Sequence, residues 1–134
     1  MDEARLKDVP LFASLSKGDL ELVARNADEV DVEAGKVLIC EGELGYEFFV
    51  VEEGAGEVRR DGAVIDTIGP SDFVGEMALL EQVSRNATVV ATSPMRLIVI
   101  TGPSFRHIER EMPAVAAQIR AAIEERAARL AAGG

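Results

Sequence analysis

The residues best suited to bind a ligand lie in one short segment, residues 72–91, which reads DFVGEMALLEQVSRNATVVA. Its pattern predicts a strand end, a glycine turn at Gly75, one helical turn over residues 76–80, a loop, and a new strand from Asn86. The first turn of a helix exposes unpaired backbone N–H groups and a partial positive charge, which suit a phosphate. Arg85 follows Glu76 by nine residues, so the loop between them can fold both side chains around one small ligand.

These two charged side chains suit different parts of a nucleotide. The Arg85 guanidinium supplies bidentate donors for phosphate oxygens, and the Glu76 carboxylate accepts a hydrogen bond from a sugar hydroxyl. Each also has an ordinary explanation, because a single loop arginine usually faces solvent and a glutamate is favourable in the first turn of any helix. An acid and a base flanking a helix start together predict a site for a nucleotide monophosphate.

The segment resembles the phosphate-binding cassette of the cyclic nucleotide-binding domain. This family includes the regulatory subunits of cAMP-dependent kinase, nucleotide-gated channels and the Crp-type bacterial regulators. Its pattern is Phe-x-Gly-Glu-(Leu/Ile/Met)-Ala-Leu-Leu, a short loop, then Pro-Arg-(Ala/Ser/Thr)-Ala-(Thr/Ser)-Val. The matching positions are Phe73, Gly75, Glu76, Met77, Ala78, Leu79, Leu80, Arg85, Ala87, Thr88 and Val89. Ser84 replaces the usual proline and Asn86 replaces the usual small or hydroxyl residue, and the resemblance extends from about Leu11 to Leu130.

This resemblance implies that the chain binds cAMP or cGMP and needs no cofactor. It assigns the phosphate to Arg85, with backbone N–H groups of Ala78 and Asn86, and the ribose 2′-hydroxyl to Glu76. The residues implied around phosphate and ribose are Gly75, Glu76, Met77, Ala78, Arg85, Asn86 and Ala87, and those on the base side are Val58, Val89, Ala127 and Leu130. For the strand valines, a place in the hydrophobic core is the alternative. Asn86 either adds a hydrogen bond to the ligand or fills the space that a cyclic phosphate needs.

The composition excludes several classes of protein. A chain of 134 residues with 48% hydrophobic residues predicts one globular domain, residues 1–134. Its formal net charge of −10 argues against nucleic-acid binding, which requires cations to neutralise phosphates. Cys40 is the only cysteine, so no intrachain disulfide is possible; we expect a small buried side chain there and a reducing, cytoplasmic location. The sequence contains no apolar run long enough for membrane insertion.

The pattern of the remaining chain predicts a mainly β fold with flanking helices, an antiparallel β-roll of the jelly-roll-like barrel type. A helical lead covers residues 1–28, with short helices over residues 9–13 and 16–27, the second capped by Ser16. A β-roll covers residues 29–101, with a hairpin turn at Asp61-Gly62. The expected strand segments are residues 37–39, 47–52, 57–59, 64–68, 88–91 and 96–100. Helices over residues 102–131 follow, interrupted at Pro113.

These features favour a regulatory binding module over an enzyme. His107 is the only histidine, too few for the metal cluster of a small β-barrel enzyme. The resemblance implies that the last helix is a mobile element that signals to an effector protein or to an output domain outside this chain. Its alanine-rich apolar seam would support at most a weak homodimer. Two alternatives remain: a ligand-free interaction module that keeps the fold, and a β-barrel enzyme.

Overall fold

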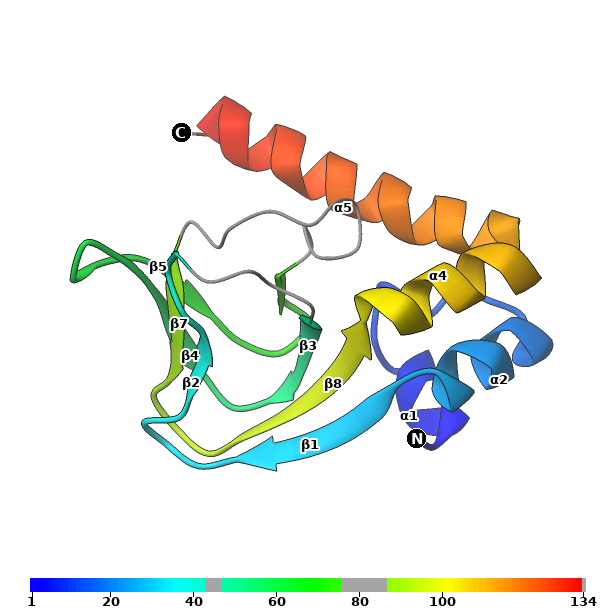
Figure 1. Cartoon of the computed structure of the whole chain (residues 1–134), viewed down its shortest axis with the longest axis horizontal. Coiled ribbons are helices and arrows are strands. Elements are labelled where there is room, and N and C mark those ends of the chain that lie inside the picture. The colour runs from blue at the N-terminus through cyan, green and yellow to red at the C-terminus, as the bar shows by residue number, and fades with distance from the viewer. Residues whose placement is uncertain (43–46, 76–86, 134) are drawn as a thin grey trace. The chain divides into compact units, whose positions relative to one another are not determined.

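The computed structural model describes residues 1–42, 47–75 and 87–133 and divides into two compact units. The helical unit comprises Met1–Asn26 and Pro103–Gly134, and the β unit comprises Ala27–Gly102 (Figure 1). The helices are α1 (Glu3–Lys7), α2 (Lys17–Arg25), α4 (Gly102–Glu111) and α5 (Pro113–Gly133). None of the helices in the described ranges has both the length and the apolar composition that spanning a bilayer requires.

The N-terminal helices begin at side-chain caps. Ser16 accepts a hydrogen bond from the Asp19 N–H at 3.2 Å, which confirms the cap predicted for α2. The helix α1, capped by Asp2, was not predicted. The helix predicted over residues 9–13 is wrong, because these residues form successive turns in which, for example, the Phe12 N–H donates to the carbonyl of Val9. Pro10 lies in this segment and has no N–H to sustain a helical ladder.

The two C-terminal helices are separate elements, which confirms the interruption predicted at Pro113. Helix α4 ends at Glu111 and α5 begins at Pro113, which has no N–H to donate to the preceding turn. Arg120 of α5 forms an ion pair with Glu109 of α4 and lies 5.6 Å from the centroid of the Phe105 ring. These two contacts link α5 to α4, and both helices also bury apolar side chains. The buried residues are Phe105, Ile108, Val115, Ala116 and Ile119.

Two four-stranded antiparallel sheets form the β unit, which confirms the mainly β prediction. Sheet A has the strand order β1-β8-β3-β6, and sheet B has the order β2-β7-β4-β5 (Figure 1). The strands are β1 (Asp28–Val32), β2 (Val37–Ile39), β3 (Glu47–Glu53), β4 (Gly56–Arg60), β5 (Ala63–Ile68), β6 (Phe73–Val74), β7 (Thr88–Ala91) and β8 (Met95–Thr101). The turn between β4 and β5 has positive φ at both Asp61 (53°) and Gly62 (81°), which confirms the predicted two-residue hairpin.

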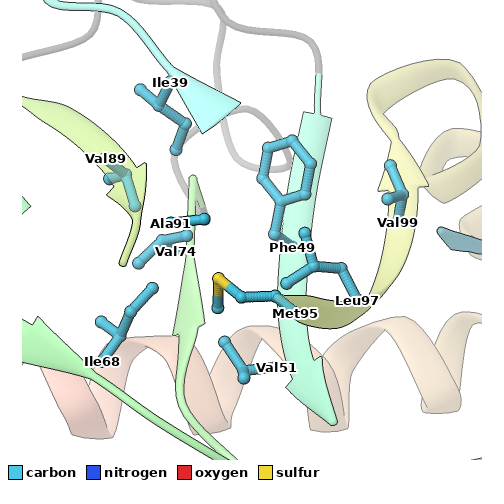
Figure 2. Close-up of a cluster of buried hydrophobic side chains, with 10 residues drawn as sticks. All are labelled: Ile39, Phe49, Val51, Ile68, Val74, Val89, Ala91, Met95, Leu97 and Val99. Carbon is cyan, nitrogen blue, oxygen red and sulfur yellow. The ribbon is translucent and has the colours of Figure 1, made fainter. Parts of the chain in front are cut away.

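The core of the β unit lies between the two sheets (Figure 2). Alternate residues of each strand point inward, as the two-residue period of a strand requires. Sheet A contributes Phe49, Val51, Val74, Met95, Leu97 and Val99, and sheet B contributes Ile39, Ile68, Val89 and Ala91. All ten are at most 9% exposed. The two inner faces therefore bury one continuous apolar cluster.

The central strands of sheet A are buried on their second face as well. Phe48, Val50, Ile98 and Ile100 are each 0% exposed. The Phe48 and Phe73 rings lie 5.5 Å apart between centroids, in a tilted arrangement. Burial on both faces explains why β3 and β8 read as continuous apolar runs instead of alternating ones.

The edge strand β1 is acidic and exposed. Among the described strands it pairs with β8 alone, in a register that includes Asp31↔Arg96, and these two side chains form an ion pair of 3.0 Å. The hydrogen bond to Asp31, with the charges of Asp31, Glu53 and Glu29, raises the pKa of Arg96 above its ordinary value. Arginine is already charged at all physiological pH values, so this pair provides no pH switch on the arginine side. An acidic edge also discourages pairing with another chain.

Gly54 provides a test of how closely β8 approaches the turn after β3. Its φ is +96°, and a Cβ there would lie 2.3 Å from the carbonyl oxygen of Pro94. Gly35 also has a positive φ, +90°, but has open space around its Cα. We expect Gly54→Ala to lower the free energy of unfolding by about 2–4 kcal/mol, since backbone strain and a steric clash add. Gly35→Ala should cost about 1–2 kcal/mol, from strain alone.

Urea denaturation of both variants measures this difference. Equal losses would mean that the Pro94 carbonyl moves aside at no cost, which would contradict the close approach.

Candidate functional site

Within the predicted cassette, residues 72–91, the stretch between β6 and β7 joins the two sheets of the β unit. Before it, β6 pairs with β3 in sheet A, in the register Phe49↔Val74 and Val50↔Phe73. After it, β7 pairs with both β2 and β4 in sheet B. Gly75 therefore leaves one sheet and Ala87 precedes a strand of the other. Of the residues implied around phosphate and ribose, these two are described, while Glu76, Met77, Ala78, Arg85 and Asn86 lie outside the described residues.

A tight turn holds the start of the cassette against β3. The Gly69 N–H donates to the Asp72 carboxylate at 2.8 Å, and the Asp72 N–H donates to the Gly69 carbonyl at 3.0 Å. The Ser71 N–H donates to the Val51 carbonyl, and the Val51 N–H donates to the Asp72 carbonyl, both at 2.9 Å. Asp72 thus has a structural role in the turn. Gly75, with φ of +79°, then turns the chain away from β6 in a conformation that favours glycine.

The end of the cassette is held by side chains. Ala87 is 8% exposed, so the structure leaves little room for a larger side chain there. The next residue, Thr88, accepts a hydrogen bond from the Glu41 N–H at its Oγ1, at 3.1 Å. The Glu41 carboxylate in turn accepts from the Asp61 N–H at 3.3 Å. The cassette is therefore anchored at both ends by hydrogen bonds to neighbouring turns and strands.

The sequence alone does not predict the hydrogen bonds that Glu41 makes with Thr88 and Asp61. Thr88 matched the family pattern, but Glu41 lies 47 residues away in the sequence. No local pattern links residues that far apart. Only the pairing of β2 with β7 brings them together.

Arg59, which lies opposite the first residue of β7, forms an ion pair within its own strand. Arg59 lies opposite Thr88 in the ladder between β4 and β7. Its Nε and Nη2 both donate to the Glu57 carboxylate, at 3.0 and 2.7 Å. Arg59 therefore offers a phosphate much less than an unpaired cation would, and the phosphate role of Arg85 stays a prediction.

The two strand residues predicted on the base side are neighbours. Val58 and Val89 face each other in register between β4 and β7. Val89 is 3% exposed within the core cluster, and Val58 is partly buried against that cluster. The structure thus gives both valines a packing role, and their contact with a base stays a prediction. Ala127 and Leu130 belong to α5, and their side chains lie outside those described.

The His, Cys, Asp and Glu side chains of the described ranges bear on the metal cluster that a small β-barrel enzyme would need. Within them, no group of three or more His, Cys, Asp or Glu side chains could hold a metal ion. His107 lies on α4, as predicted, and is half-buried. The prediction of a buried Cys40 is wrong, because this side chain is exposed. It follows Ile39, which points into the core, so the alternation of the chain turns Cys40 outward.

Known proteins share both the sequence pattern and the fold. The family model described as the cyclic nucleotide-binding domain matches residues 29–111. The cAMP-dependent protein kinase regulatory subunit of Schizosaccharomyces pombe is 34% identical over 107 residues, which are 79% of this chain and 26% of that protein. The chain spans about a quarter of the length of the curated relatives it matches.

Two solved structures show the same likeness in three dimensions. The N-terminal domain of a transcriptional regulator from Streptomyces coelicolor superimposes with a TM-score of 0.78 at 27% identity, covering 98% of this chain and 94% of that one. The catabolite activator protein of Thermus thermophilus gives a TM-score of 0.79 at 27% identity, covering 91% and 59% of the two chains. The family match includes β6, the whole cassette and β7, and it covers more than half of the sequence. The chain therefore belongs to the cyclic nucleotide-binding domain family.

Proposed function

We propose that this chain is a cyclic nucleotide sensor that binds cAMP at the cassette between β6 and β7. The observation that carries the proposal is the family match over residues 29–111, which contains the cassette in register. The name of the S. pombe relative, a cAMP-dependent kinase regulatory subunit, supports cAMP as the ligand. In this proposal Arg85 binds the cyclic phosphate and Glu76 accepts the ribose 2′-hydroxyl, and the chain catalyses no reaction.

The charge of the protein makes a local phosphate site necessary. With 24 acidic and 14 basic residues, the long-range field repels an anionic nucleotide. Binding must then rest on short-range contacts, namely the Arg85 guanidinium and the backbone N–H groups of the cassette. Because such contacts are screened less than surface charges are, we expect affinity to change little with added salt.

The proposed output is a shift of the C-terminal helices that a partner detects. The interruption at Pro113 between α4 and α5 supplies a natural hinge. The partner would be an effector protein or an output domain outside this chain, and the family names, a kinase regulatory subunit and a transcriptional regulator, are consistent with either. The single cysteine supports a cytoplasmic location for this module.

A second candidate function is a ligand-free interaction module. One observation favours it: Asn86 replaces the small or hydroxyl residue that the family pattern has next to the arginine. A larger side chain at this position would compete with the cyclic phosphate for space. Calorimetric titration of the purified wild-type protein with cAMP and cGMP distinguishes the two functions, because the interaction module would give no binding heat with either nucleotide.

Arg85→Ala tests the phosphate assignment. We expect cAMP binding to weaken by about 2–4 kcal/mol, since a charge-assisted pair loses one partner. Calorimetry measures the affinity, and thermal unfolding should show that the variant remains folded. Arg110→Ala on the exposed end of α4 removes the same charge elsewhere and should bind like the wild type. An Arg85→Ala variant with wild-type affinity would exclude the phosphate role.

The choice of base gives a second test of the site. Ala127 and Leu130, which the resemblance assigns to the purine, are both apolar. An apolar cap leaves the more polar edge of guanine without hydrogen-bond partners, so we expect cAMP to bind more tightly than cGMP. Competition of both nucleotides against a fluorescent cAMP analogue measures the ratio of affinities. Tighter binding of cGMP would contradict this preference.

The proposed shift of the C-terminal helices predicts which residues become protected from amide hydrogen exchange. At saturating cAMP, amide hydrogen exchange should slow in residues 75–88 and 114–130 and change little in residues 37–51. The β strands are held by ladders and a packed core, whereas α5 follows a hinge and can respond to a population shift. The same measurement with linear 5′-AMP serves as the control. Protection confined to residues 75–88 would rule out the helix shift and leave a passive binding site.

A further inference from the structure

The side chains of Glu41 and Thr88 connect three segments at one end of sheet B. The Glu41 N–H, just after β2, donates to the hydroxyl of Thr88, the first residue of β7, at 3.1 Å. The Glu41 carboxylate accepts from the N–H of Asp61, in the turn between β4 and β5, at 3.3 Å. We call Glu41, Thr88 and Asp61 the polar clasp.

The polar clasp begins where backbone pairing between β2 and β7 ends. The last register pair of these strands at this end is Ile39↔Val89. At the residue before Val89, the Thr88 hydroxyl instead of a backbone group accepts the hydrogen bond from Glu41, which follows β2. The clasp therefore extends the connection between the two segments up to the first residue of β7. Ala87, the last residue implied in the cassette, is adjacent to it, and Arg85 precedes it by three residues.

A threonine in a strand needs no special explanation by itself. Thr88 is β-branched and lies opposite Arg59, where valine would have a similar strand preference. What a valine would lack is the acceptor for the Glu41 N–H. The Thr88 hydroxyl, which accepts this hydrogen bond, therefore distinguishes a positioning role from simple strand packing.

We propose that the polar clasp positions the nucleotide site: by fixing Thr88 at the start of β7, it holds the adjacent Ala87 in place before the ligand arrives. This inference rests on the proposed function. Thr88 acts through the residues that precede it and is a positioning residue, not a ligand of the nucleotide. Without the clasp, the pairing with β4 remains at Thr88, but part of the ordering of Ala87 and Thr88 must be completed on binding. That entropic cost reduces the measured affinity.

Three variants of the full chain separate the hydroxyl from the rest of the side chain. Thr88→Val removes the hydroxyl and keeps the shape, whereas Thr88→Ser keeps the hydroxyl and loses a methyl group. Thr67→Val makes the same change as the first at an exposed site on β5 of the same sheet. Calorimetry with cAMP measures the affinity of each variant. Hydrogen exchange of the Glu41 amide in the ligand-free protein reports whether the bond is lost.

We expect Thr88→Val to bind cAMP roughly tenfold more weakly, which is the scale of one hydrogen bond's net contribution. Its Glu41 amide should exchange faster, while its melting temperature stays above the titration temperature. Thr88→Ser should recover most of the affinity, and Thr67→Val should bind like the wild type. Recovery by serine is a result that a purely apolar packing role would not produce.

Two results would overturn the inference without touching the proposed function. One is wild-type cAMP affinity in Thr88→Val, and the other is an equal loss in Thr88→Ser and Thr88→Val. A wild-type protein that binds neither cAMP nor cGMP would overturn the proposed function itself, and the positioning role with it.

Discussion

The antiparallel pairing of β3 with β8 is the interaction on which the rest of the β unit depends. These strands form the centre of sheet A, and β1 and β6 attach to their outer sides. The central residues of both strands are apolar on both faces, and the charged residues Glu47 and Arg96 lie near the strand ends. One face forms the core with sheet B, and the other buries a second set of side chains that includes Phe48 and Ile100. Because β6 attaches to β3, this pairing also decides where the cassette begins.

The position of the cassette between two sheets has a functional consequence. Its first end is held on sheet A by the turn at residues 69–72, and its second end is held on sheet B by the polar clasp. Each anchor consists of hydrogen bonds from backbone N–H groups to a carboxylate, a hydroxyl or a carbonyl. In the proposed function, fixing Asp72 and Thr88 beforehand leaves less conformational entropy to be lost when the ligand binds. The scaffold can thereby contribute to affinity without touching the nucleotide.

Local signals in the sequence predicted most elements of the fold. The Asp61-Gly62 turn, the Ser16 cap and the break at Pro113 each follow from the chemistry of one or two residues, and each appears as expected. The apolar runs that became β3, β4, β5, β7 and β8 were also recognised. The missed strand β1 has a long-range cause. Strand β1 is acidic and exposed, and it is a strand because β8 pairs with it from more than sixty residues away.

Some features of the candidate site can also be predicted from the sequence, and others depend on the fold. By itself, the sequence indicated the family and most of the strands and helices, because turn, cap and motif chemistry are carried by residues close together in the chain. The roles of the residues in the cassette stay predictions. Only the tertiary structure decided that Val89 belongs to the core, that Cys40 faces outward, and that Glu41 holds Thr88. These facts depend on strand register and on which face of a sheet is covered, and both are set by contacts between residues far apart in the sequence.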